Sequence, residues 1–339
     1  MYLGASKSRA GADEKDCLGF QSPQQNSEPQ MLPPQTPGLL NSPRELNPHW
    51  QCRQCQAVND YPASFIDGYF CGSPLVCGQC GVSVPVWTVS LQQLKNPHLW
   101  DLFLPLGATT TIFQSKLFLD TDTILDLHQH GLPATAVILD VQYTGNGLFC
   151  AERAGGSRRQ RPRGARLQFY GFKTYTMPNA PAEGTVNIAV TWVPSSDSDF
   201  AWNNLVSAFD AFADQDYVGV VIPANVAVEN RLFYLMNEEL GQTCSAEQRE
   251  NFLTDAATYS HQLNVLLPYI ATIRGFSRMD DQLRGNLNRL RTLRNQIGHQ
   301  GRTKKPFTGE DCAVALASAV FGFRYVNLMV DWRRRNPLT

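Results

Sequence analysis

The sequence predicts a multidomain protein: a small segment with paired cysteines, an all-β domain and a C-terminal α-helical bundle. Three observations lead to this prediction. Two closely spaced cysteine pairs lie between residues 52 and 80, short β-branched and aromatic runs follow as far as Val193, and from about Asp199 the apolar residues recur at helical spacing. A chain of 339 residues also exceeds the size of one small core, so several domains are expected.

The composition is that of an ordered globular protein. Hydrophobic residues make up 43% and charged residues 17%, and a formal net charge of -1 excludes a general polycation. The charge is unevenly distributed, however. Asp197 to Asp255 holds eleven acidic against two basic residues, whereas Arg274 to Lys305 holds nine basic against two acidic residues. This asymmetry predicts either two oppositely charged helices packed side by side or a basic surface for phosphate backbones, and both can hold together.

Several features indicate a cytoplasmic protein with no membrane partner. Residues 1–48 are rich in Gln, Ser, Pro and Asn, so we expect a disordered tail, and they contain no apolar stretch of signal-peptide length. Nine cysteines, an odd number, argue against a disulfide framework. The segment from Cys312 to Val330 approaches membrane-span length, but Arg324 in its interior indicates a buried helix.

Residues 49–86 contain the paired cysteines, Cys52-x2-Cys55 and Cys77-x2-Cys80, with twenty-one residues between the pairs. Each pair brings two thiolates onto one turn, and two such knuckles complete a tetrahedral Zn²⁺ site. The pattern resembles a zinc ribbon, a family whose knuckles flank short strands. Because no histidine or carboxylate lies at ligand spacing, we expect closed, structural zinc that contributes folding free energy. Whether the ribbon also binds nucleic acid or protein stays open.

Residues 87–196 form the predicted β-rich domain, either a barrel or a sandwich. Short runs rich in β-branched and aromatic residues alternate there with turn residues, which is typical of strands joined by loops. The predicted strands are Thr109–Phe113, Thr135–Tyr143, Arg166–Tyr175 and Thr185–Val193.

The longest break in this domain, from Glu152 to Arg166, contains six arginines. A loop of this composition attracts RNA or DNA without sequence preference and in a salt-sensitive way. It can equally be a solvated loop with no partner. The candidate RNA-binding residues are Arg158, Arg159, Arg161 and Arg163.

Residues 197–339 predict an up-and-down bundle of four or five helices. The first contains Trp202 to Phe212, and the second begins at Pro223, since proline is tolerated in a first turn, and stops at Gly241. Ser245, with Gln248 in the capping-box position, begins a long third helix that reaches about Ile273. The last two expected helices run from Asp280 to Gly298 and from Thr308 to roughly Arg333.

The fourth predicted helix ends in Leu293-Arg294-Asn295-Gln296-Ile297-Gly298-His299. Arg294 is a permanent cation, and a histidine such as His299 can exchange protons near neutral pH. Cleavage of RNA without a metal requires at least these two groups, a cation for the phosphate and a general acid–base catalyst. Five helical steps place the two side chains about 140° apart. We therefore expect them to converge only if the helix ends or distorts near His299, which Gly298 and Gly301 would permit.

The pattern Arg-Asn-x3-His, on a leucine-spaced helix followed by one more helix, resembles the HEPN superfamily over roughly Asp199 to Arg335. That family's motif is an arginine, usually a polar residue, and a histidine after a short spacer, and Arg294, Asn295 and His299 match it. The resemblance implies a helical bundle that dimerises, so that two motifs face each other in a metal-independent endoribonuclease site. Members occur in toxin–antitoxin, abortive-infection and CRISPR-linked defence systems.

The resemblance also implies residue roles and partners. The ribose 2′-hydroxyl would be the nucleophile, His299 the general base or acid, and Arg294 the group that stabilises charge on the phosphate, with Asn295 positioning them. The expected partners are RNA, a second copy of the chain, and an antitoxin or phage-derived trigger.

An acidic residue from an early helix often joins the family's site. Glu229 is our candidate, although Glu238 and Glu239 compete with it. The alternative to an enzyme is a non-catalytic HEPN-like module. In that case the helices only dimerise, and the ribbon and the arginine-rich loop hold nucleic acid or protein.

Overall fold

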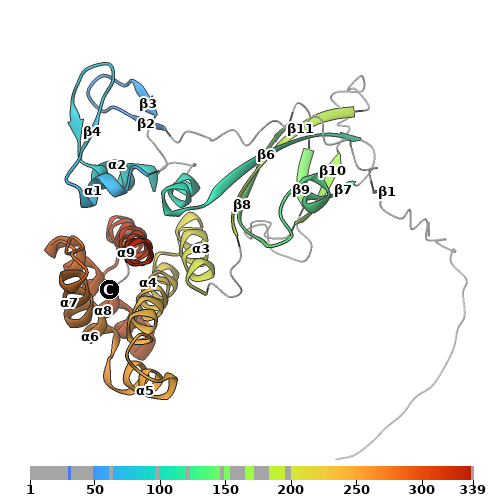
Figure 1. Ribbon diagram of the computed structural model, residues 1–339. Helices are drawn as coiled ribbons and strands as arrows, with labels where there is room; N and C mark the ends of the chain where they lie inside the picture. The colour runs from blue at the N-terminus through green and yellow to red at the C-terminus, as the bar shows by residue number, and fades with distance from the viewer. Residues whose placement is uncertain are drawn as a thin grey trace, which may run out of the picture.

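The computed structural model describes residues 30–31, 49–60, 64–95, 99–118, 123–145, 149–152, 165–171, 183–194 and 200–336 (Figure 1). Apart from a two-residue strand, β1 (Gln30–Met31), the predicted disordered tail lies outside the described residues. The candidate RNA-binding arginines Arg158, Arg159, Arg161 and Arg163 lie outside them as well.

The cysteine-rich segment contains two small antiparallel hairpins. In the first, β2 (His49–Gln51) pairs with β3 (Val58–Asp60), and in the second, β4 (Leu75–Val76) pairs with β5 (Ser83–Val84). A short helix, α1 (Asp67–Phe70), lies between them in sequence. A two-stranded hairpin is marginal in isolation, so this segment needs further contacts to keep its shape.

Two helical segments follow, where the sequence predicted the start of the β-rich domain, and that prediction is wrong for these residues. The segments are α2 (Val86–Gln93) and the 3₁₀ helix η2 (Leu99–Leu106). Val89, Leu102 and Phe103 are buried in the same hydrophobic core as the C-terminal helices. In α2, burial against that core outweighs the strand preference of the β-branched residues Val86, Thr88 and Val89, which is a weak and context-dependent tendency.

The β region consists of two sheets. The first has the antiparallel order β6-β11-β8, and the second has the order β1-β7-β10-β9. All four predicted strand regions contain strands. The bounds are β6 (Thr109–Phe118), β7 (Thr123–Asp126), β8 (Ala136–Gly145), β9 (Phe149–Glu152), β10 (Arg166–Gly171) and β11 (Glu183–Pro194), with a 3₁₀ turn, η3 (Leu127–His130), after β7.

One hydrophobic core lies between the two sheets. Phe113 and Ile188 enter it from the first sheet, and Leu125, Leu167 and Phe169 enter it from the second. Two sheets that share a core without joining into one hydrogen-bonded ring make a sandwich, so the described strands favour the sandwich over the barrel.

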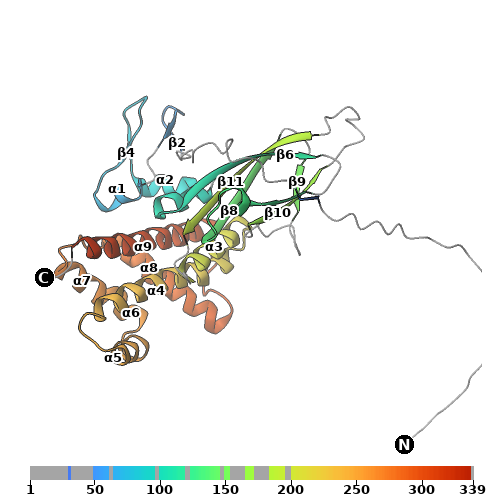
Figure 2. The ribbon, with the colours of Figure 1, turned by 45° about the vertical axis from the view of Figure 1, so that its right-hand side comes forward.

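Four long helices build the C-terminal region: α3 (Phe200–Ala213), α4 (Tyr217–Leu240), α8 (Asp281–Gln300) and α9 (Gly309–Arg335). Figure 2 shows α9 between the other long helices and α2. The predicted capping box at Ser245 with Gln248 is present, and Thr308, the predicted start of the last helix, forms a second capping box with Asp311. Among the described helices, α9 alone is long and apolar enough to cross a membrane, and 78% of its most apolar window is buried.

The predicted start of the second helix is wrong. Helix α4 begins at Tyr217, after Asp216, whose carboxylate accepts a hydrogen bond from the Gly219 N–H at 3.0 Å. Pro223 therefore lies inside the helix, where its ring nitrogen cannot donate to the Gly219 carbonyl. The helix tolerates one missing bond because its buried face packs against α3, α8 and α9. It ends at Gly241, as predicted.

The predicted long third helix is broken. It consists of α5 (Ala246–Asn251), the π-helical turn η4 (Phe252–Ala256), α6 (Tyr259–His261), the π-helical turn η5 (Gln262–Leu266) and α7 (Leu267–Ile273). The chain leaves helical geometry at Ala257 and Thr258. The Gln262 side chain compensates for the break, because its amide donates to the Ala257 carbonyl at 2.7 Å.

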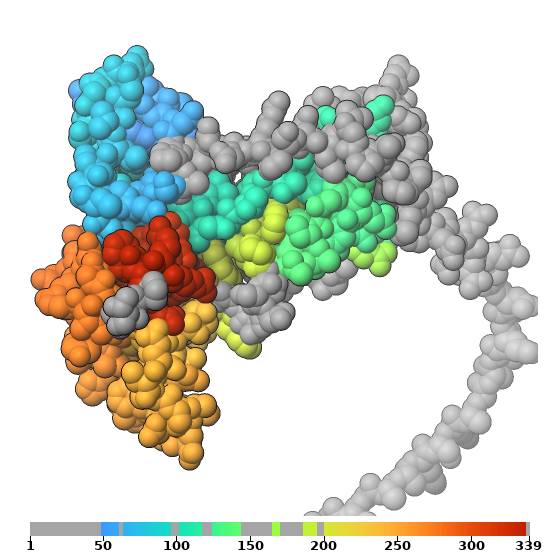
Figure 3. Space-filling model, in the orientation of Figure 1, coloured from blue at the N-terminus to red at the C-terminus, as the bar shows by residue number. Residues whose placement is uncertain are grey.

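The cysteine-rich segment packs on the bundle. In Figure 3 it lies directly above the C-terminal residues, which are drawn in red and orange. The Tyr69 ring of α1 meets the Phe321 ring of α9 edge-to-face, with 4.8 Å between centroids. Arg324 of α9 donates two hydrogen bonds, of 2.6 and 2.7 Å, to the Asp67 carboxylate. The basic residue inside the apolar helix therefore serves as an anchor for this segment.

Candidate functional site

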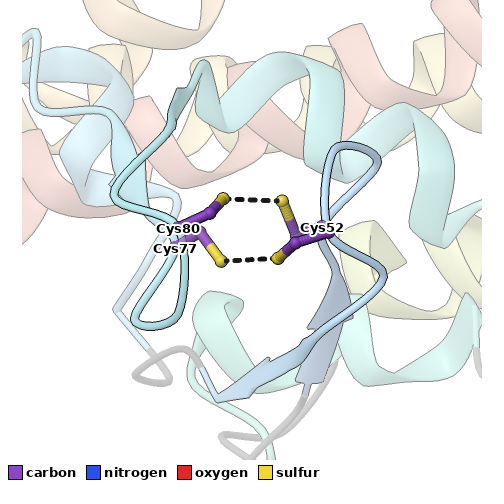
Figure 4. Close-up of side chains that lie close together, drawn as sticks. Cys52, Cys77 and Cys80 are labelled. Carbon is purple, nitrogen blue, oxygen red and sulfur yellow. Dashed lines mark hydrogen bonds between the residues drawn. The ribbon is translucent and has the colours of Figure 1, made fainter.

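The four paired cysteines converge on one point. Their sulfur atoms all lie within 4.8 Å of one another, with 3.7 Å between Cys52 and Cys80 and 3.5 Å between Cys55 and Cys77 (Figure 4). A tetrahedral ion with metal–sulfur bonds of about 2.3 Å would place its sulfurs about 3.8 Å apart. The predicted ligands are therefore close together and could bind a metal ion.

The two knuckles have the same backbone geometry. In each, the first cysteine's carbonyl accepts a hydrogen bond from the N–H four residues later, at 2.8 Å for Cys52 and Gln56 and at 2.9 Å for Cys77 and Gly81. The donor residue is left-handed in both, with φ of 62° at Gln56 and 71° at Gly81. Glycine adopts this conformation freely, whereas glutamine is strained in it. The repeated turn aims both pairs of thiols at a common centre.

Asn59 connects the hairpin of the first knuckle to the second knuckle. Its amide nitrogen donates to the Cys77 sulfur at 3.5 Å, and its amide oxygen accepts from the Gly78 N–H at 2.8 Å. The backbone N–H of Cys80, followed by that of Gln79, lowers the pKa of the Cys77 thiol to about 6. Hydrogen bonds of this kind stabilise the thiolate that a metal requires. No local pattern in the sequence links Asn59 to the cysteines, so its role could not be predicted.

The arginine–histidine motif lies near the C-terminal end of α8. The helix ends near His299, as expected, but it continues through His299 to Gln300, so that His299 lies within the last turn of α8. Gly301 then ends it, with a φ of 66° and an N–H that donates to the Ile297 carbonyl at 2.8 Å. On an undistorted helix Arg294 and His299 remain about 140° apart. Within one chain the two side chains therefore diverge, and His299 is exposed.

Arg294 and Asn295 line a cavity of about 530 Å³, which we call the motif cavity. Arg294 donates to the Asn295 side-chain oxygen at 3.2 Å. Glu229 lines the same cavity from α4 and accepts a hydrogen bond of 3.2 Å from the Asn225 amide. Three of the four predicted catalytic residues are thus brought together, whereas His299 is not among the lining residues.

The two competing glutamates lie elsewhere on α4. Glu239 forms a buried ion pair with Arg274 at 2.6 Å, with side chains only 8% and 1% exposed. Glu238 pairs with Arg333 at 2.8 Å. Acidic residues of α4 are therefore paired with arginines from later in the chain. Arg274 belongs to the basic stretch from Arg274 to Lys305, whereas Arg333 lies outside it.

Several residues of the motif cavity were not among the predicted site residues. Arg291 precedes Arg294 by three positions, a spacing that puts two residues on one helix face and could have indicated it. Tyr259 and Gln262 come from the irregular segment between α5 and α7, which helical periodicity does not reveal. Single π-helical turns are frequent at functional sites. The full lining is Asn225, Glu229, Asn230, Phe233, Leu253, Thr254, Ala257, Thr258, Tyr259, Ser260, Gln262, Arg291, Arg294 and Asn295.

Comparisons of this chain with protein-family models, with curated proteins and with solved structures found no match. The interpretation of the site therefore rests on its residues and their geometry.

Proposed function

We propose that this protein is a metal-independent endoribonuclease of a defence or toxin type, acting as a homodimer in the cytoplasm. The observation that supports the proposal best is the motif cavity. Arg294 and Asn295 of the HEPN-like motif line it together with Glu229, the acidic residue expected from an earlier helix. A guanidinium, an amide and a carboxylate at one cavity can bind and orient a phosphodiester and its neighbouring hydroxyl.

In the proposed reaction the ribose 2′-hydroxyl attacks the adjacent phosphorus, and the bond from phosphorus to the 5′-oxygen breaks. The products are a 2′,3′-cyclic phosphate and a 5′-hydroxyl. His299 accepts the proton of the nucleophile or donates a proton to the leaving oxygen. Arg294 stabilises the negative charge that grows on the phosphate, and Asn295 and Glu229 orient these groups.

The direction of His299 supports the proposed dimer. Because His299 diverges from the Arg294 of its own chain, we propose that a second copy brings its motif against the first. The two motifs then form one composite site on RNA. An antitoxin or a phage-derived trigger is the proposed regulator of that assembly.

We further propose that the metal at the four cysteines is structural zinc. Four thiolates fill a tetrahedral coordination sphere and leave no open position for a substrate, and the sulfur separations of 3.5 and 3.7 Å suit Zn²⁺. In this role the ion holds together a zinc ribbon that the Arg324–Asp67 ion pair anchors to the bundle.

The divergence of Arg294 and His299 also favours a second candidate, a non-catalytic HEPN-like module. In that case the bundle serves for dimerisation, and the ribbon and the arginine-rich loop bind nucleic acid or protein. The enzyme and the module differ in what His299→Ala does, because only the enzyme needs the imidazole.

The test is cleavage of total cellular RNA by the purified full-length protein in EDTA. Wild type is compared with Arg294→Ala, with His299→Ala and with Gln300→Ala, a matched control at the next exposed position of α8. Bound zinc is quantified before and after the incubation in EDTA, so that loss of the ribbon is not mistaken for loss of catalysis.

We expect wild type and Gln300→Ala to produce fragments that end in 2′,3′-cyclic phosphate. The rate should fall by about 100-fold or more in the other two variants. Cleavage by Arg294→Ala and by His299→Ala at the wild-type rate would contradict the catalytic assignment. RNA binding and dimerisation by a wild type that leaves every RNA intact would favour the module.

A further inference from the structure

The inner wall of the motif cavity contains polar side chains that the proposed cleavage reaction does not use. Asn225, Gln262 and Tyr259 line the cavity and are only 1%, 4% and 7% exposed. None of the described residues provides a hydrogen-bond partner for the Asn225 Oδ1, Gln262 Oε1 or Tyr259 hydroxyl. Arg291 Nε, on the α8 side, has none either. Buried polar atoms are usually paired, so this group calls for a ligand.

The two amides present acceptors. The Asn225 amide nitrogen is already engaged with Glu229 at 3.2 Å, and the Gln262 amide nitrogen with the Ala257 carbonyl at 2.7 Å. These bonds set the orientation of both amides, so the atoms left over are oxygens. A ligand at this wall must therefore bring N–H or O–H groups.

The remaining unpaired groups are donors. Burial, followed by the charge of Glu229, raises the pKa of the Tyr259 phenol, while Arg291 opposes the shift. The phenol therefore keeps its proton and has no acceptor among the described residues. The Arg291 side chain is a cationic guanidinium, and its Nε–H is a donor. A ligand must bring acceptors to this side of the cavity.

Charge and shape narrow the class of ligand. Arg291 and Arg294 lie on one face of α8 and outweigh the single carboxylate of Glu229, so the cavity favours an anion. Phe233, also in the lining, is 39% exposed and offers an aromatic face. A volume of about 530 Å³ lies in the range of small-molecule sites. A simple anion would use the guanidinium groups and leave the buried amide oxygens unpaired.

We propose that the motif cavity binds one nucleotide, with its phosphate at Arg291 and Arg294 and the N–H groups of its base at Asn225 and Gln262. Tyr259 donates to an acceptor of the same nucleotide, and Phe233 offers its ring for stacking. The inference deepens the proposed function and rests on it for RNA as the source of the nucleotide. A free mononucleotide has the same chemistry and is the other source to be tested. Arg291 and Tyr259 are then positioning residues for the scissile phosphate.

The experiment measures binding apart from cleavage. The zinc-loaded full-length protein is titrated with a short RNA whose 2′-hydroxyls are methylated, so that the nucleophile is blocked. Parallel calorimetric titrations use the four nucleoside 5′-monophosphates and inorganic phosphate. The site variants are Tyr259→Phe and Arg291→Gln. Their matched controls are Tyr269→Phe, at a tyrosine of α7 that is 63% exposed, and Arg335→Gln, at an exposed arginine of α9.

We expect each site variant to weaken nucleotide binding about tenfold or more, because each loses a hydrogen bond to the ligand, and each control to change it less than twofold. Tyr259→Phe removes only an unpaired hydroxyl, so its thermal midpoint should equal or exceed that of wild type. Binding of the methylated RNA identifies RNA as the source, and binding of monophosphates without RNA identifies a free nucleotide.

Two outcomes overturn the inference. One is unchanged affinity in both site variants, and the other is inorganic phosphate that binds as tightly as the nucleotides. Both outcomes can be distinguished from a failure of the proposed nuclease activity. Wild type that binds through Tyr259 and Arg291 but leaves every RNA intact favours the non-catalytic module over the nuclease and leaves the cavity assignment in place. Wild type that cleaves RNA while both site variants bind and cleave normally refutes the cavity assignment alone.

Discussion

Loss of the Arg324–Asp67 ion pair should loosen the cysteine-rich segment from the helical bundle. The guanidinium makes two charge-assisted hydrogen bonds, of 2.6 and 2.7 Å, to the carboxylate. The two side chains are 15% and 28% exposed, so water screens the pair only in part. Asp67 opens α1, whose aromatic residues pack on α9. The pair therefore couples two parts of the chain that are far apart in sequence.

The expected magnitude lies between two limits. Exposed ion pairs contribute about 0–1 kcal/mol, and removal of one partner of a fully buried pair costs about 3–5 kcal/mol. For this partly buried, two-bond pair we expect a coupling of about 1.5–2 kcal/mol. Arg289 and Asp311 form the control pair, with a single bond of 2.7 Å and an arginine that is 60% exposed. Its coupling should be about 0.5 kcal/mol or less.

The assay is a double-mutant cycle on each pair. Arg324→Ala, Asp67→Ala and the double variant are unfolded in urea, with zinc bound, and the free energies of unfolding give the coupling. The same cycle is run on Arg289 and Asp311. A coupling between Arg324 and Asp67 that is no larger than that of the exposed pair would refute the reasoning, because partial burial and the second hydrogen bond would then contribute nothing.

Three further predictions concern local features. X-ray absorption of the metal-loaded protein should show four sulfur ligands at about 2.3 Å, and a chelator should abolish protection from hydrogen exchange in residues 49–60 and 64–86. Gln56→Gly should raise the free energy of unfolding by about 0.5–1 kcal/mol, whereas Gly81→Ala should lower it by about 1–2 kcal/mol, since both positions are left-handed. The Thr308 hydroxyl, then its backbone N–H and Arg289, lower the pKa of Asp311. Its carboxylate therefore stabilises the fold above the unfolded pKa of about 4, and this contribution is lost as pH falls through the lower folded pKa. The stability difference between wild type and Asp311→Asn should shrink accordingly in acid.

Each of these predictions has a contrary result. Nitrogen or oxygen ligands in the absorption spectrum would contradict the four-thiolate site. A loss of stability in Gln56→Gly would show that the glutamine side chain contributes more than its backbone strain costs. A difference between wild type and Asp311→Asn that persists unchanged into acid would mean that the carboxylate charge is not what the cap requires.

Local patterns in the sequence predicted local structure well. The capping box predicted at Ser245 and the helix start predicted at Thr308 are both present, because a cap depends on residues within one turn. The cysteine spacing predicted four convergent thiols for the same reason. The predicted start of α4 is wrong because Pro223 lies inside the helix, whereas the Asp216 cap lies earlier.

The sequence by itself determined the four-thiol cluster, the strand regions, the helix caps and the residues of the Arg-Asn-x3-His motif, since each depends on neighbours along the chain. Only the tertiary structure decided how the motif is used. The motif cavity draws on α4, on the broken segment around Tyr259 and on α8, and packing alone brings these together. Tertiary packing likewise placed Arg324 beside Asp67 and made helices of residues 86–93 and 99–106. Burial and charge neutralisation act between residues distant in sequence, so no local pattern records them.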